Sequence, residues 1–404
     1  MPSDSPDRAP SWLDEIPDRL AALDAAHLTR RRREVRPAGG ASMWVDGRRM
    51  LAFCSNDYLG LSQHEAVRAA AIDGAQRYGV GSGASPMVSG HSEANAALER
   101  ELADFVGLER ALYFYAGYAT NASIVPALVG PGDALFSDAL NHACLIDGAR
   151  LSKAQVHRFE HADLAQLDAL LQASPARRKL VISDAVFSMD GDVADIPALI
   201  ALCERHDALL LLDDAHGFGV CGPQGRGSLA AVARTGAQAS RRVLYMATLG
   251  KAAGVSGAFV AGPSMLVEWL LQTTRSYTFA TAAPALLAQS VRAALHAIRD
   301  EPVHLERLHR NIAHLRAGLP AAIAGAGWTL LPSLTAVQAL VIGTNDAALR
   351  AMGALADAGL WVPAIRPPTV PEGTARLRIA LSAAHEPEDI DTLLRALGDA
   401  ARRR

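Results

Sequence analysis

The sequence has few cysteines, no long apolar run and charges that nearly cancel. Its four cysteines among 404 residues lack any Cys-x-x-Cys spacing, which argues against a disulfide framework or a zinc knuckle. The formal net charge of -3 gives no electrostatic footprint for a nucleic-acid partner. No apolar stretch approaches the roughly 18 residues of a membrane span, and acidic residues among the first twenty argue against a secretory signal peptide. We therefore expect a cytoplasmic protein with reduced thiols and no membrane partner.

Between about residues 62 and 290, helix-like stretches alternate with short apolar runs. Apolar residues in these runs are continuous rather than alternating, which is typical of strands buried on both faces and predicts a mostly parallel central sheet flanked by helices. The runs lie at 111–114, 134–136, 179–187, 208–212, 243–247 and 257–261, and the helix-like stretches at 66–78, 94–106, 164–173 and 198–206.

The same reasoning predicts an α/β protein of three parts. Residues 1–60 form an N-terminal arm, 61–290 a large α/β domain and 291–404 a smaller α+β C-terminal domain. The arm has a helix at 12–35 and a hairpin at 42–53, and the small domain begins with a long helix at 292–318. Its further elements are predicted at 337–342, 345–358, 360–365, 377–379 and from Pro387 onward.

Polar side chains follow several predicted strands at their carboxyl ends, where open α/β sheets bind ligands. Asp213 and His216 follow the apolar run 208–212. A carboxylate there suits a cation such as the protonated ring nitrogen of pyridoxal phosphate (PLP). The alternative is a helix cap after a core strand.

Lys251 lies in a loop of small residues after the run 243–247. A lysine that forms a Schiff base attacks as the neutral amine, so partial burial favours that role. Thr248, three residues earlier, would reach a phosphate oxygen. Taken alone, Lys251 is better explained as a solvated loop lysine.

Two further segments suit the same cofactor. Gly117 and Tyr118 open a helix whose free N–H groups would bind phosphate, and His142 would lie flat against an aromatic ring. A plain strand-to-helix turn and a structural histidine are the alternatives. The acidic segment 187–192 lacks the spacing of a calcium loop, so we expect no metal site there. The glycine loop 79–84 follows a helix-like stretch rather than a strand, which argues against dinucleotide binding.

Taken together and in this order, the motifs resemble the α-oxoamine synthase family of fold-type-I PLP enzymes. The matching motifs are Ser55-Asn56-Asp57-Tyr58-Leu59-Gly60, Gly81-Ser82-Gly83, residues 186–192, Asp213-Asp214-Ala215-His216 and Thr248-Leu249-Gly250-Lys251. The segment Ile365-Arg366-Pro367-Pro368-Thr369-Val370-Pro371-Glu372-Gly373-Thr374-Ala375-Arg376-Leu377-Arg378 is similar to the 8-amino-7-oxononanoate synthase branch of that family.

The resemblance implies a role for each matching residue. Lys251 would bind PLP as a Schiff base, Asp213 would pair with its ring nitrogen, and His142 would stack on the ring. His216 and Ser188 would bind the phenolic oxygen, and Gly117, Tyr118 and Thr248 the phosphate. Arg366 would hold the amino-acid carboxylate, and the other substrate contacts would come from Arg30, Asn56, His142 and Thr369. The catalytic groups would be Lys251, Asp213, His142 and His216.

The implied reaction is a decarboxylative condensation of L-alanine with pimeloyl-CoA or a pimeloyl-acyl-carrier protein in biotin synthesis, catalysed by a homodimer. Sister synthases using glycine or serine, an aminotransferase and a non-catalytic relative are the alternatives. The sequence departs from the family at Asp184-Ala185, Phe218 and Ala252-Ala253, changes that we expect to alter the thioester pocket.

Overall fold

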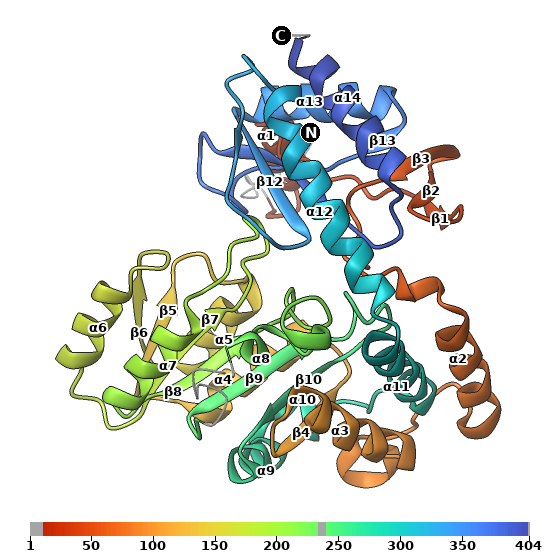
Figure 1. The fold of residues 1–404 in the computed structure, drawn as a ribbon. Helices are drawn as coiled ribbons and strands as arrows, with labels where there is room; N and C mark the ends of the chain where they lie inside the picture. Colours follow the sequence, from red (N-terminus) through yellow and green to blue (C-terminus); the bar gives the residue numbers. More distant parts are fainter. Residues whose placement is uncertain (1–10, 233–239, 403–404) are drawn as a thin grey trace, which may run out of the picture.

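A computed structural model describes residues 11–232 and 240–402, so residues 1–10 of the predicted arm lie outside it. Figure 1 shows a lower part built on a large sheet and an upper part that contains both ends of the described chain. The helix α12 (Val303–Ala322) runs from one part into the other. Within the described ranges, no helix has the length and apolarity to cross a membrane.

The lower part is a seven-stranded sheet in the order β4-β10-β9-β8-β7-β5-β6. The neighbours from β9 to β6 are all parallel, and only β10 runs antiparallel to its two partners. The strands are β4 (Arg110–Phe114), β5 (Ala134–Asp138), β6 (Gln155–Phe159), β7 (Lys179–Asp184), β8 (Leu209–Asp213), β9 (Val243–Thr248) and β10 (Ala258–Gly262). The predicted mostly parallel sheet is confirmed.

Helices cover both faces of this sheet, so its strands carry apolar side chains on each side. In β8, Leu210 and Leu212 join one buried cluster, whereas Leu211 joins the other. This alternation explains why the strand reads as one continuous apolar run. The covering helices are α2 (Glu65–Tyr78), α3 (Glu93–Val106), α4 (Gly117–Leu128), α5 (Ala143–Ser152), α6 (Leu164–Ala173), α7 (Ile196–Arg205), α8 (Ser228–Ala231), α9 (Ser264–Thr273), α10 (Arg275–Thr278) and α11 (Ala285–Asp300).

The upper part combines the N-terminal hairpin with the C-terminal region. Strand β3 of the hairpin pairs in parallel with β13, which lies about 300 residues later. A second small sheet has the order β11-β12-β15-β14. The elements are β1 (Val35–Pro37), β2 (Ser42–Val45), β3 (Arg48–Ala52), β11 (Thr329–Leu330), β12 (Val337–Gly343), β13 (Leu360–Trp361), β14 (Ala364–Ile365), β15 (Ala375–Ala380), α13 (Asn345–Asp357) and α14 (Pro387–Arg402). The boundaries at residues 60 and 290 stay predictions.

Two predicted helices were wrong in extent. The helix predicted at 12–35 is α1 (Ile16–Ala25), which buries none of its residues and ends before His27, whose φ is 56°. Without a packed face, nothing extends such a helix. The long helix predicted at 292–318 is two helices, α11 and α12. Pro302 separates them because proline disfavours helical backbone in the residue before it, and Glu301 has φ -119° and ψ 72°.

Candidate active site

The last residues of four neighbouring parallel strands carry polar side chains. They are Asp138 on β5, Asp184 on β7, Asp213 on β8 and Thr248 on β9. Because the carboxyl ends of parallel strands meet at one edge of the sheet, three of these side chains share a pocket.

This cofactor pocket has a volume of about 190 Å³. It opens at the strand ends and brings together most of the residues that the sequence analysis selected for the cofactor. Its lining consists of Gly117, Tyr118, Asn121, His142, Cys144, Asp184, Asp213, Ala215, His216, Met246, Thr248 and Lys251.

Asp213 is the fixed acid of the pocket and is only 3% exposed. Its Oδ2 accepts a hydrogen bond from Asn121 Nδ2 at 2.5 Å, and its Oδ1 accepts one from the backbone N–H of Ala215 at 2.9 Å. Both oxygens are therefore held in place before any ligand binds, as a preorganised charge requires.

Lys251 points its amine into the same pocket. Its Nζ lies 2.7 Å from His216 Nε2. Burial lowers the pKa of Lys251 to about 8, although the nearby carboxylates of Asp213 and Asp184 favour the charged form. At pH 7.5 about a quarter of such an amine is neutral, compared with about a thousandth for an exposed lysine. The neutral fraction is the nucleophile.

A chain of hydrogen bonds leads from Lys251 to a buried arginine. His216 Nδ1 lies 2.6 Å from the Tyr58 hydroxyl, which donates to Asn56 Oδ1 at 3.1 Å. Arg378 Nη1 and Nη2 also donate to that Asn56 oxygen, each at 3.3 Å. Burial holds the pKa of His216 well below its usual value, so the ring is neutral. A neutral imidazole has one donor and one acceptor nitrogen, so His216 bridges the Tyr58 hydroxyl and the Lys251 amine in either tautomer.

The opposite end of the pocket is the start of helix α4. Gly117 is its first residue, and a Cβ on Gly117 would lie 3.4 Å from Thr248 Oγ1, so the helix start and this hydroxyl face one space. The N–H groups of the first turn have no partner within the helix and favour an anion there. Thr248 Oγ1 donates to the Gly257 carbonyl at 3.1 Å, which fixes its position.

His142 lines the pocket and is one of its more solvent-accessible residues. It caps α5, and its backbone N–H donates to Asp184 Oδ2 at 2.7 Å. Burial and the charge of Asp213 raise the pKa of Asp184 well above its usual value. The pKa of His142 is lowered by desolvation, which keeps the ring neutral at pH 7. A neutral ring with a free face suits stacking on an aromatic cofactor.

These residues fit PLP. The pocket contains the fixed carboxylate of Asp213, the amine of Lys251 and the imidazole of His142. The space for a phosphate lies between the start of α4 and Thr248, and a side chain at position 117 would narrow this space. In this arrangement Asp213 would hold the ring nitrogen, Lys251 the aldehyde carbon, and Gly117, Tyr118 and Thr248 the phosphate.

The remaining predicted residues lie around this pocket rather than in its lining. Asn56 reaches it through Tyr58, and the backbone carbonyl of Ser188 accepts from Arg378 Nε at 2.6 Å. Thr369 lines a separate cavity of about 270 Å³ that also includes Asn141.

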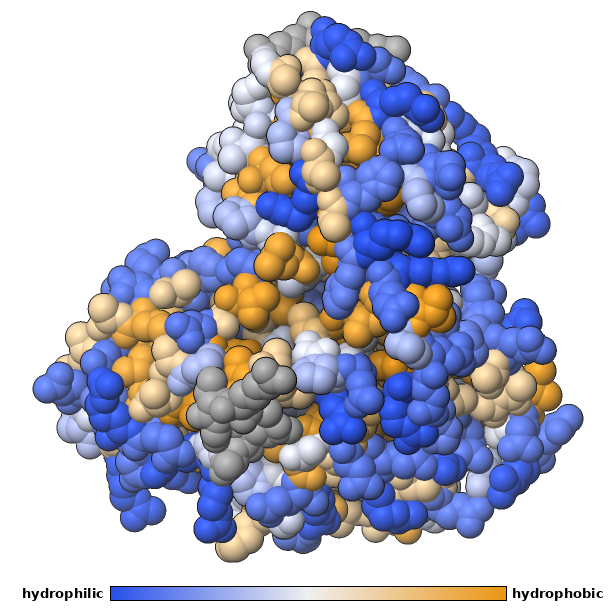
Figure 2. Space-filling view, viewed as in Figure 1, coloured by the Kyte–Doolittle hydropathy of each residue, from blue (hydrophilic) through white to orange (hydrophobic). Residues whose placement is uncertain are grey.

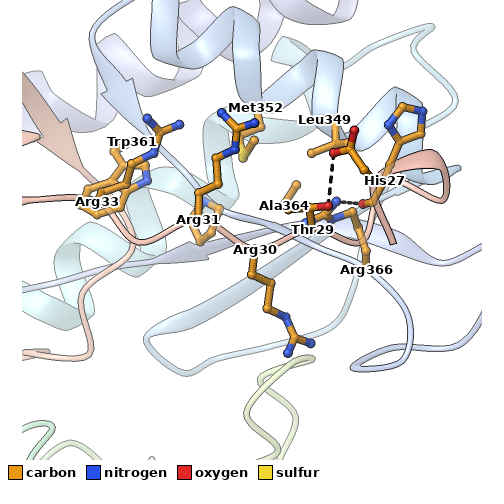
Figure 3. A pocket seen from close by; sticks show the side chains of 12 residues that line it. His27, Thr29, Arg30, Arg31, Arg33, Leu349, Met352, Trp361, Ala364 and Arg366 are labelled. Atoms are coloured by element: carbon orange, nitrogen blue, oxygen red, sulfur yellow. Dashed lines mark hydrogen bonds between the residues drawn. The ribbon is translucent and has the colours of Figure 1, made fainter. Parts of the chain in front are cut away.

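Arg30 and Arg366 line another cavity, of about 410 Å³, in the upper part of the molecule. Figure 3 shows Arg30 pointing away from Arg31 and Arg33 in this cavity. The guanidinium of Arg366 donates to the backbone carbonyl of His27 through Nη1. The structure thus separates the predicted substrate residues into three places. Arg30, Arg31 and Arg33 all line this cavity and are exposed.

Three departures from the family pattern, Phe218, Ala252 and Ala253, lie in the buried core. Phe218 is 1% exposed and packs edge-on against Phe105 and Phe259, with ring centroids 5.5 and 5.3 Å away. Ala252 and Ala253 are fully buried as well. Of the departures, only Asp184 lines the cofactor pocket, and an effect of the others on the thioester pocket stays a prediction.

The sequence reasoning missed Asn121, Cys144, Tyr58 and Arg378. The last two stand inside the motifs that carried the resemblance, so their positions were visible but their roles were not. Cys144 and Asn121 join Asp213 through buried side-chain contacts, since Asn121 Nδ2 also lies 3.2 Å from Cys144 Sγ. Only the fold brings these residues together.

Three relatives place this geometry in a known group. An 8-amino-7-oxononanoate synthase from Paracidovorax citrulli is 71% identical over 97% of this chain and 95% of its own. A serine palmitoyltransferase from S. paucimobilis with bound PLP–myriocin aldimine superimposes with a TM-score of 0.89 at 28% identity, covering 98% of both chains. An 8-amino-7-oxononanoate synthase from Francisella tularensis has a TM-score of 0.74 at 26% identity, covering 87% of this chain and 98% of its own.

The family model for aminotransferase class I and II matches residues 48–397, which span the large sheet and most of the upper part. The strand order, the pocket and the relatives agree with the fold-type-I prediction. This chain therefore belongs to the aminotransferase class I and II family and, within it, to the 8-amino-7-oxononanoate synthases.

Proposed function

We propose that this chain condenses L-alanine with a pimeloyl thioester to give 8-amino-7-oxononanoate, carbon dioxide and the free thiol, as a step of biotin synthesis. The observation that carries the proposal is the amine of Lys251 beside the fixed carboxylate of Asp213, in a chain 71% identical to a synthase of that name. The thioester is of CoA or of an acyl-carrier protein. PLP, when bound, would supply an electron sink for the negative charge that develops at the α-carbon of alanine.

The residues around the bound cofactor would position the amino acid and transfer its α-proton. Lys251, once free, would accept the α-proton, because its lowered pKa of about 8 suits proton transfer near neutral pH. His216 Nε2 would hold the amine in place through the 2.7 Å contact. The mutual alignment of the α-C–H bond and the amine sets the rate of this step.

The geometry favours Arg378 as the group that holds the amino-acid carboxylate. Arg378 is 6% exposed, and among the described residues its guanidinium lies in no ion pair with a carboxylate. Arg376, two residues earlier on β15, is paired with Asp190. A buried guanidinium without a counter-ion is costly, so a substrate carboxylate beside it would be bound strongly. The prediction that Arg366 has this role stays a prediction.

We also propose that the chain forms the homodimer implied by the family, because exposed apolar side chains gather on its surface. Val80, Val88 and Phe279 are each more than 70% exposed. They lie on neighbouring segments, because the Ala282 N–H donates to the Ala84 carbonyl at 3.0 Å. Apolar side chains that gather on adjacent loops are typical of a protein interface. Figure 2 shows apolar side chains gathered also where the upper and lower parts meet.

A product assay tests the proposed reaction. Purified protein with PLP, L-alanine and pimeloyl-CoA is expected to release carbon dioxide and free CoA in equal amounts and to form 8-amino-7-oxononanoate, measured by mass spectrometry. Glycine with acetyl-CoA is the matched control for the sister synthases, and a 2-oxo acid without carbon dioxide would indicate an aminotransferase. Turnover of glycine with acetyl-CoA in preference to the alanine pair would overturn the proposal.

The carboxylate role is tested with Arg378→Lys and Arg366→Lys. Lysine keeps the charge but loses the planar two-point contact. We expect Arg378→Lys to raise the KM for L-alanine by about 10- to 100-fold, as expected for the loss of a hydrogen bond to a charged group. Its KM for the thioester should change little. A large rise with Arg366→Lys and none with Arg378→Lys would assign the carboxylate to Arg366 instead.

A further inference from the structure

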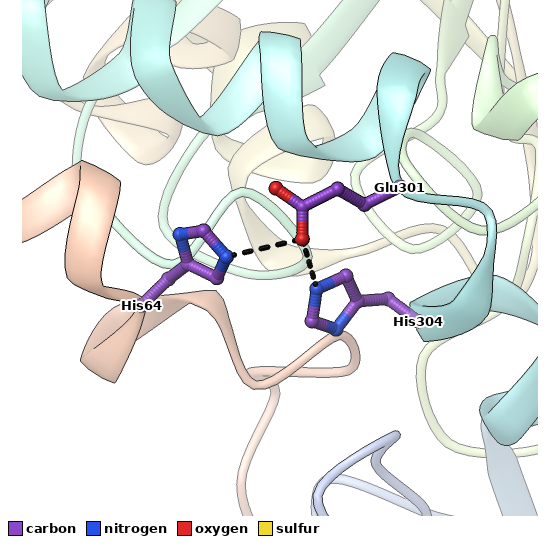
Figure 4. A group of neighbouring side chains, drawn as sticks. All are labelled: His64, Glu301 and His304. Atoms are coloured by element: carbon purple, nitrogen blue, oxygen red, sulfur yellow. Dashed lines mark hydrogen bonds and ion pairs between the residues drawn. The ribbon is translucent and has the colours of Figure 1, made fainter.

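Two histidines and a glutamate converge at the junction between α11 and α12, away from the cofactor pocket. His64 directly precedes α2, Glu301 directly follows α11, and His304 is in the first turn of α12. Figure 4 shows the Nε2 atoms of both rings directed at one carboxylate oxygen. His64 Nε2 lies 3.3 Å and His304 Nε2 3.2 Å from Glu301 Oε2.

We propose that His64, Glu301 and His304 bind one divalent transition-metal ion of the Zn²⁺ class. Two ligand atoms that each lie about 2.0–2.1 Å from a tetrahedral zinc are about 3.3 Å apart, which matches both nitrogen–oxygen distances. All three ligand atoms lie within 4.8 Å of one another, so the two nitrogens need only a small approach. Two imidazoles and one carboxylate form a ligand set that zinc uses in proteins.

The surroundings suit a metal with one open position. The side chains of His64 and His304 are 19% and 20% exposed, and Glu301 is 43% exposed, so water would complete the coordination on the Glu301 side. His64 Nδ1 is buried without a hydrogen-bond partner among the described residues. Histidine ligands are usually oriented by a second hydrogen bond, so we expect micromolar rather than nanomolar affinity.

The ion would link His64 to Glu301, two residues that are 237 positions apart in the sequence. His64 follows the short helix η1 (Leu61–Gln63), and a Cβ on Gly254 would lie 2.4 Å from the Ser62 nitrogen. The loop that carries Lys251 thus packs directly against the segment before His64. Glu301 and His304 flank Pro302, where the chain passes from the lower part toward the upper part. A metal here would hold this junction against the base of the active-site loop.

Binding of the metal alone tests the proposal. Chelator-treated holoenzyme is titrated with ZnCl₂ by calorimetry, and its melting temperature is followed in parallel. We expect one Zn²⁺ per chain and a rise in melting temperature of about 2 °C or more at saturation. Co²⁺ in place of Zn²⁺ should give the visible bands of a low-coordinate cobalt site.

His304→Gln and Glu301→Gln should each weaken this binding at least tenfold and remove the rise in melting temperature. Glu301→Gln keeps both side-chain size and a hydrogen-bond acceptor, so its fold should persist. The matched control is His296→Gln, a histidine of α11 that lies 3.8 Å from Glu101 and should leave binding unchanged. Equal zinc binding by wild type and both site variants, or no binding by wild type, would mean that the cluster is only hydrogen-bonded. Neither result bears on the condensation reaction.

Discussion

Lys251→Ala is expected to abolish turnover, with a fall in kcat of about 10⁴-fold or more, and to remove the visible absorption of lysine-bound PLP. The side chain would supply both the nucleophile that holds the cofactor and the base that takes the α-proton, so its loss removes two functions at once. Absorption spectra of the purified variant with added PLP, followed by the product assay, measure both effects.

The chain contains only three lysines, which makes the control simple. Lys179 lies at the first residue of β7, at the opposite edge of the sheet from the pocket, where its Nζ donates to the His206 carbonyl at 3.4 Å. Lys179→Ala should keep the absorption and the activity. After borohydride reduction, mass spectrometry should find the cofactor on residue 251 alone. Labelling of Lys153 or Lys179 in its place would disprove the assignment.

The lowered pKa adds a pH signature to the same experiment. Because the neutral amine reacts, the rate at which cofactor-free protein captures PLP should rise with pH and level off above about pH 8. An exposed lysine would give a rate that keeps rising past pH 9, since its pKa is about 10.4. A rise that continues in this way would show that the amine is not buried in the pocket.

The sequence predicted the large sheet well because strands buried on both faces appear as continuous apolar runs. The strand it missed, β6, is at the edge of the sheet, where Gln155, Val156 and Arg158 are exposed and no such run forms. The break between α11 and α12 was also missed, although Pro302 stands in the sequence. Helical periodicity continues on both sides of this proline and conceals the change of direction.

The candidate site could be predicted wherever its residues follow a strand. Asp213, Thr248 and Lys251 occupy strand ends or the loop after one, and parallel strands place such ends together without further information. Arg378 and Asn56 are 322 residues apart and meet only because β15 and the segment after β3 pack in the same region. Asn121, on the second turn of α4, touches Asp213 through tertiary packing alone. Pairings of this kind leave no periodic or local pattern in the sequence.

Asp213→Asn and Asp214→Asn should separate catalysis from stability at two adjacent residues. Asparagine at 213 keeps an acceptor oxygen for Asn121 or Ala215 but removes the charge beside the cofactor's ring nitrogen, so we expect kcat to fall by about 10²- to 10³-fold. The melting temperature of the cofactor-free protein should change little. Steady-state assays and thermal unfolding of the same preparations provide both measurements.

Asp214 points away from the pocket and is fully buried. Its carboxylate accepts hydrogen bonds from the Ser228 N–H at 2.7 Å, the Ser228 hydroxyl at 2.6 Å and the Tyr245 hydroxyl at 2.7 Å. The asparagine amide would direct its own N–H groups at the Ser228 and Tyr245 donors. We expect this to lower the free energy of unfolding by about 1–3 kcal/mol. Asp214→Asn should therefore melt earlier yet keep most of its kcat at low temperature. If Asp214→Asn lost activity while Asp213→Asn kept it, the acid that faces the cofactor would be Asp214, and the pocket described above would be assigned to the wrong side of β8.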